Sequence, residues 1–80
     1  QALALMNNSF VLRQSRSFAT RIRRDVGDDP NTQARQAFQL ALTRDPTAEE
    51  LRHTATLIRQ HGLSNACWVL VNSSEFLFSP

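Results

Sequence analysis

The sequence predicts an all-α fold, a small antiparallel bundle of about four helices with a short N-terminal lead helix at residues 1–6. Apolar residues recur at helical spacing in several segments, and nowhere do they alternate with polar residues in the period of a β-strand. The chain has only 2 Gly and 3 Pro, and both glycines and the first two prolines fall between the apolar-periodic segments. Because 80 residues can build one core, we expect residues 1–80 to form a single helical domain.

The first long helix is predicted over residues 10–26, with Asn8 or Ser9 as the residue that caps its N-terminus. One face carries apolar or small residues, namely Val11, Ser15, Phe18, Ala19, Ile22 and Val26. Arginines occupy the opposite face. This arrangement is typical of a helix that packs one side on a core and exposes the other to water.

The second helix is expected after a break at Gly27, which suits a helix C-terminus, and Pro30, which suits a helix start. Asn31 or Thr32 is the predicted cap. The apolar stripe of this helix consists of Ala34, Ala37, Phe38, Ala41 and Leu42. Since three of these five are alanine, another helix can approach closely there.

The third helix begins at a capping box, in which the Thr47 hydroxyl and the Glu50 carboxylate each accept a hydrogen bond from the other residue's backbone N–H. It is predicted to end near His61, with Leu51, Ala55 and Ile58 facing inward and Gly62 as a left-handed cap.

The fourth helix follows a short linker at 62–64, so it must double back on the third. Ser64 or Asn65 is the predicted cap. We expect residues 66–71 to be a central core helix and residues 72–78 to be a separate tail, first polar and then aromatic.

The first helix carries five arginines whose side chains could contact phosphates: Arg13, Arg16, Arg21, Arg23 and Arg24. Three aspartates, Asp25, Asp28 and Asp29, follow at once and offset much of that charge, and the net charge of the chain is only +2. We therefore favour a solvated face with intramolecular salt bridges. Binding of a polyanion or nucleic acid through this face stays open as the alternative.

No residue pattern specifies a reaction, so we predict that the chain is not an enzyme and has no catalytic, cofactor-binding or metal-binding residues. His53 and His61 lie two helical turns apart, too far to share a metal ion, and no Cys or carboxylate completes a ligand set. Cys67, in an apolar helix, is expected to be a small buried thiol. Glu49 and Glu50 are explained by helix capping.

Residues 72–78 hold the candidate interaction residues, which are Asn72, Glu75, Phe76 and Phe78. Asn72 is expected to make a buried hydrogen bond to backbone. Glu75 stands near a helix C-terminus, where a carboxylate is unfavourable, so we expect it to pair with Arg44 or with an arginine of the first helix. The aromatic end and the apolar start at Leu3, Leu5 and Met6 either pack in the core or form a patch facing other parts of the protein.

No apolar run approaches the roughly 20 residues that span a bilayer, so no membrane span is predicted. The sequence starts inside an apolar segment without an initiator methionine, and we therefore expect a fragment whose partner is the remainder of its own chain. Its oligomeric state is left open. The favoured function is a non-catalytic structural or interaction module. Besides polyanion binding, the other alternative is an accessory domain of an enzyme or electron-transfer protein whose active groups lie elsewhere.

Several phrases of the sequence, at 1–7, 10–12, 37–38, 42–51 and 70–78, together resemble the C-terminal part of the large exported planctomycete-type proteins of unknown function. In those proteins such a helical region often accompanies a c-type cytochrome module. The resemblance implies an all-helical region with no catalytic residues to carry over. It also implies an exported or periplasmic setting for the protein.

Overall fold

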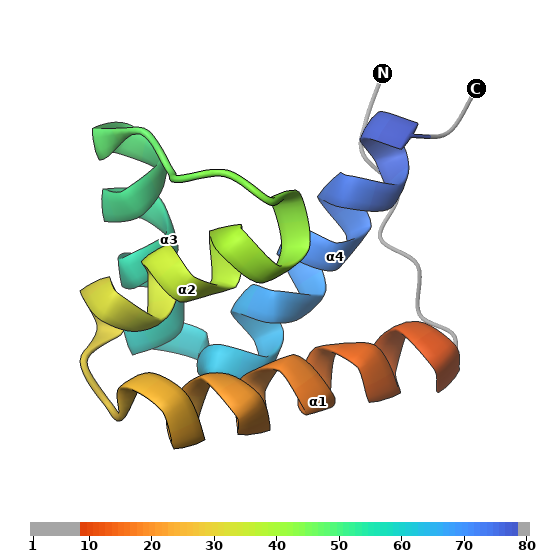
Figure 1. Ribbon diagram of the computed structural model, residues 1–80, viewed down its shortest axis with the longest axis horizontal. Helices are drawn as coiled ribbons and strands as arrows, with labels where there is room; N and C mark the ends of the chain where they lie inside the picture. The colour runs from red at the N-terminus through yellow and green to blue at the C-terminus, as the bar shows by residue number, and fades with distance from the viewer. Residues whose placement is uncertain (1–8, 79–80) are drawn as a thin grey trace.

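The computed structural model describes residues 9–78, and for residues 74–78 only the helical backbone. Four helices make up this part of the chain, and it contains no strand, which confirms the all-α prediction. They are α1 (Ser9–Val26), α2 (Pro30–Leu42), α3 (Ala48–His61) and α4 (Leu63–Phe78) (Figure 1). The predicted lead helix at 1–6 lies outside the described residues.

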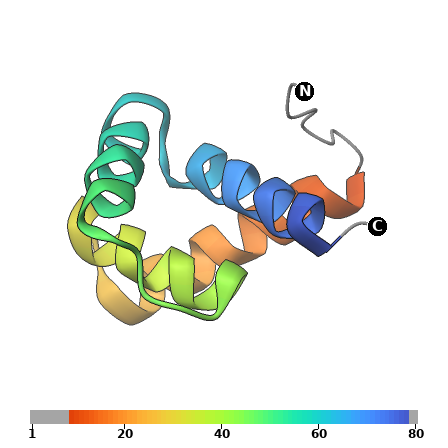
Figure 2. The ribbon, with the colours of Figure 1, turned by 90° about the horizontal axis from the view of Figure 1, so that it is seen from above.

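Helices α2 and α4 form the middle of the fold, because each of them contacts all three of the other helices. The most extensive contact of α4 is with α1, while α2 and α3 pack on each other as well as on α4. In the view from above, α2 and α3 lie together on one side of the molecule, and α4 lies over α1 on the other (Figure 2). Buried small residues, Ala34 and Ala37 on α2 and Ala66 and Cys67 on α4, lie in the core that these helices share.

The core combines side chains from all four helices: Ala19, Ile22, Ala34, Ala37, Phe38, Ala55, Ile58, Leu63, Ala66, Cys67 and Leu70. The predicted inner face of α1 is confirmed, since its buried residues are Val11, Ser15, Ala19 and Ile22. The predicted stripe of α2 is buried at Ala34, Ala37 and Phe38 and half-buried at its end. Helical spacing of apolar residues thus located the core correctly.

The N-terminus of α2 differs from the prediction, because Asp29 caps it rather than Asn31 or Thr32. The Asp29 carboxylate accepts hydrogen bonds from the Thr32 backbone N–H and hydroxyl, both at 2.9 Å. The physical reason is Pro30, which takes the first helical position, where its missing N–H costs nothing. The residue before it must then be extended, and Asp29 has φ −74° and ψ 120°.

The turn between α3 and α4 is tighter than predicted, because Gly62 is the only residue between the two helices. Its N–H donates to the Ile58 carbonyl at 2.9 Å, and its own carbonyl accepts from the Ala66 N–H at 3.2 Å. Gly62 has φ 93° and ψ 159°, which is not the expected left-handed helical conformation but a region open almost solely to glycine. One glycine therefore ends α3 and starts α4.

The predicted division of the last helix is wrong, since α4 runs without interruption from Leu63 to Phe78. Polar residues in its middle do not break it, because their side chains bond to the preceding turn. Asn72 Nδ2 donates to the Trp68 carbonyl at 2.8 Å, and Ser73 Oγ donates to the Val69 carbonyl at 3.0 Å. Both bonds are compatible with a continuous helix.

Candidate functional site

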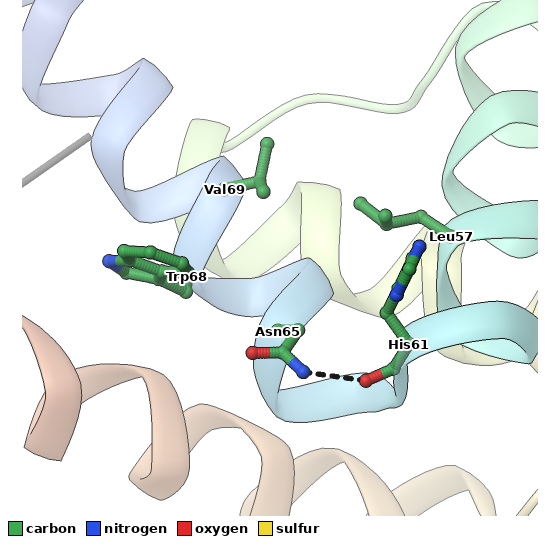
Figure 3. Close-up of a pocket in the computed structure, with 5 residues that line it drawn as sticks. All are labelled: Leu57, His61, Asn65, Trp68 and Val69. Atoms are coloured by element: carbon green, nitrogen blue, oxygen red, sulfur yellow. Dashed lines mark hydrogen bonds between the residues drawn. The ribbon is translucent and has the colours of Figure 1, made fainter. Parts of the chain in front are cut away.

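A shallow groove with a volume of about 320 Å³ lies between α3 and α4. Its lining residues are Leu57, His61, Asn65, Trp68 and Val69 (Figure 3). Leu57 extends from α3 toward Val69 on α4, and the His61 imidazole stands beside Leu57. At the floor, Asn65 Nδ2 donates to the His61 carbonyl at 2.6 Å.

The chemistry of this groove is that of an apolar surface with one titratable side chain. His61 is exposed and comes from the last turn of α3, while Leu57, Trp68 and Val69 are half-buried. None of the five lining residues is a carboxylate or a thiol that could act with the imidazole as an acid–base or nucleophilic pair. The groove can therefore hold an apolar side chain, but its described lining offers no pair of catalytic groups.

The arginine face of α1 is divided by its ion pairs. Asp25 lies 3.9 Å from Arg21 Nε and 3.2 Å from Arg24 Nε, so the expected intramolecular salt bridges are present at this end. Arg23 lies near α4, where its charge lowers the pKa of Cys67. Arg13 and Arg16, in the N-terminal half, are exposed and have no hydrogen bond or ion pair among the described residues.

Cys67 is buried at 1% exposure, as predicted for a small core thiol. Burial raises its pKa to about 11, against a smaller opposing effect of Arg23. At neutral pH the side chain is therefore a protonated thiol, which is a poor nucleophile and a poor metal ligand. In the described part of the chain, no group of three or more His, Cys, Asp or Glu side chains gathers in a way that could hold a metal ion.

The candidate interaction residues at the end of α4 fall into two groups. Asn72 is 3% exposed, and its predicted hydrogen bond to backbone is confirmed. The side chains of Glu75, Phe76 and Phe78 lie outside the described residues, so their contacts stay predictions. Arg44, one of the two partners expected for Glu75, instead pairs with Glu50.

Sequence reasoning missed two polar contacts that join neighbouring elements. Gln33 is 4% exposed, and its Nε2 donates to the Gly27 carbonyl at 2.6 Å, which ties α2 to the end of α1. Arg44 donates to both carboxylate oxygens of Glu50 and lies 5.3 Å from the Phe38 ring centroid. The one signal for the Arg44 contact was the short connection between α2 and α3, which keeps these residues close.

A family model described as PSD1, a protein of unknown function (DUF1553), matches residues 1–58. This stretch includes α1, α2 and most of α3. It also contains every segment on which the sequence resemblance was based, except the one at 70–78. No curated protein and no solved structure matches the chain.

Proposed function

The chain belongs to the PSD1 family of proteins of unknown function (DUF1553), and from this premise we propose that it is a non-catalytic packing module of a larger protein. The proposal rests on one observation: the buried polar side chains make hydrogen bonds within the fold. Ser15 Oγ donates to the Val11 carbonyl at 2.8 Å, in the same way that Asn72 and Gln33 donate to backbone. Among the described residues, no buried side-chain nitrogen or oxygen is left without a hydrogen-bond partner. These hydrogen bonds hold the described part of the fold together.

Two ionised side chains with perturbed pKa values, Glu50 and Asp29, also stabilise the fold. Arg44 and the Thr47 backbone N–H lower the pKa of Glu50 to about 2. Hydrogen bonds from Thr32 hold the pKa of Asp29 below its usual range. Both carboxylates cap helices. Perturbed pKa values often mark active sites, but here each has a structural cause at a helix N-terminus.

A packing module needs a surface that its partner can cover, and the proposed partner is the remainder of the same protein. The surface offers the groove between α3 and α4 and the exposed Phe10. None of the described helices is both long enough and apolar enough to cross a membrane. We propose that the partner surface lies on another folded part of the protein.

The proposal is tested in the longer protein by unfolding this module alone. Ile22→Asp puts a charge at a fully buried position and should unfold the module. Thr20→Asp introduces the same charged side chain at an exposed position of the same helix and is the matched control. We expect Ile22→Asp, but not Thr20→Asp, to lower the melting temperature and soluble yield of the rest of the protein. A remainder that is equally stable in both variants contradicts the proposal.

We also propose an exported setting, beside a c-type cytochrome module in the same protein. The support is the resemblance of the sequence to the exported planctomycete-type proteins. Fractionation of the native host, with detection by an antibody against this chain, is the test. Recovery outside the cytoplasmic fraction is the expected result, and recovery wholly within it overturns this part of the proposal.

A further inference from the structure

We propose that Phe10, Arg13 and Arg16 form a docking row on α1 for an acidic surface of a protein partner. This inference rests on the proposed function, because it names the part of the module that meets the rest of the protein. The three residues follow one another at intervals of three, so each is a neighbour of the next on the helix surface. All three are exposed, whereas the buried face of the helix is formed by other residues.

Phe10 gives the docking row its apolar part. It is 57% exposed, which sets it apart from the other large hydrophobic side chains of the described residues. Figure 1 shows α1 lying along one edge of the molecule, so one long side of the helix is not covered by α2, α3 or α4. Ser17 and Thr20, both small and exposed, follow one turn after Arg13 and Arg16. A partner can therefore approach this side without meeting bulky side chains.

The charge of the docking row is not neutralised within the described structure. Arg21 and Arg24 share Asp25, and Arg44 has Glu50. Arg13 and Arg16, like Arg23 further along the helix, have no ion pair there, and the first turn of α1 has no acidic residue. The docking row lies toward the N-terminus of α1, where the positive end of the helix dipole adds to the positive electrostatic potential. The guanidinium groups of Arg13 and Arg16 can each bind a carboxylate through paired hydrogen bonds.

The shape of the charged region favours a protein partner over a nucleic acid. The two arginines of the docking row are separated by only about 4.5 Å along the helix axis. Toward the other end of α1, the acidic Asp25 and the exposed Asp28 interrupt the positive surface. A phosphate backbone is better matched by a longer basic track. Arginine next to an exposed aromatic ring is instead typical of the centre of a protein–protein interface.

The experiment titrates the whole chain, observed by NMR and calorimetry, with a helical peptide of Glu-Ala-Ala-Leu repeats. We expect the peptide to shift the backbone amide signals of Phe10, Arg13 and Arg16. The double variant R13Q/R16Q should weaken binding about tenfold or more. The variant R35Q/R52Q removes two exposed arginines on other helices and has the same net charge. It should change the affinity by less than about twofold.

Three results overturn the docking row. One is equal weakening by R13Q/R16Q and R35Q/R52Q, and the second is equal binding of a peptide in which Gln replaces Glu. The third is tighter binding of duplex DNA or heparin than of the peptide at the same salt concentration, which assigns the surface to polyanions. The proposed function is tested separately by Ile22→Asp. If the proposed function is wrong, this substitution does not change the stability of the rest of the protein. If Ile22→Asp still destabilises that part, the module docks through another surface.

Discussion

The Arg44 guanidinium and the Glu50 carboxylate form a two-pronged ion pair across the connection between α2 and α3. Nη1 lies 2.8 Å from Oε1, and Nη2 lies 2.8 Å from Oε2. Oε1 also accepts from the Thr47 backbone N–H at 2.8 Å, so one carboxylate serves both the ion pair and the capping box. The pair therefore couples the end of α2 to the start of α3.

Acid should destabilise the fold through Glu50. Its pKa is about 2 in the folded chain and near the ordinary 4.5 once the chain unfolds. A lowered folded-state pKa means that its stabilising contribution is complete above about pH 4.5 and is lost as the pH falls toward 2. We expect the free energy of unfolding, measured by urea titration, to fall across this window.

The matched variants for this prediction are Glu50→Gln and Glu49→Gln, because both residues lie in the first turn of α3. Glu50→Gln should lower stability at pH 7 and flatten its dependence on pH between 4.5 and 2. Glu49→Gln should keep most of that dependence. Identical pH profiles for the two variants would show that the ion pair with Arg44 has no measurable effect on folding.

Thr43→Gly is expected to stabilise the protein. Thr43 ends α2 with φ 54° and ψ 34°, a left-handed conformation that costs a β-branched residue about 1–2 kcal/mol. Glycine removes this cost but gains entropy in the unfolded chain, so we predict a net gain of about 0.5 kcal/mol in the free energy of unfolding. Thr20→Gly, inside α1, should instead cost about 0.5 kcal/mol. A loss of stability in both variants contradicts the explanation.

Ile22→Ala should be strongly destabilising, because the side chain is 0% exposed and lies in the core. Removing its three outer carbons leaves a cavity, and the expected cost is about 2–5 kcal/mol. Thr20→Ala, at an exposed site two residues earlier, should change stability by less than about 0.5 kcal/mol. Equal effects of the two substitutions in chemical denaturation would mean that this face of α1 is not the buried one.

Helical periodicity and cap chemistry were sufficient to predict most of the fold. The inner face of α1 and the Thr47–Glu50 capping box follow from short-range patterns, and the structure confirms both. The predicted cap of α2, Asn31 or Thr32, lies two or three residues after the observed cap, Asp29. All three side chains can accept a hydrogen bond from a helix N-terminus, so residue type alone does not distinguish them. Pro30 decides between them, since its ring fixes the first helical position.

The features that escaped prediction depend on contacts between elements. The Arg44–Glu50 pair depends on the path of the connection after α2, and the groove depends on α3 and α4 bringing Leu57 and Trp68 to one surface. The sequence did not predict that α4 is continuous, because Asn72 and Ser73 are residue types that are common at helix ends. In the fold their side chains donate to carbonyls four residues earlier in the same helix, so these polar residues are compatible with a continuous α4.

The most direct test of the packing-module account is calorimetric titration of this chain into the remainder of the longer protein, expressed as a separate piece. The account predicts saturable one-to-one binding with a dissociation constant of about 1 μM or tighter. The Ile22→Asp variant should release no binding heat, since it lacks the folded surface. No binding by the folded wild-type chain at about 100 μM contradicts the account.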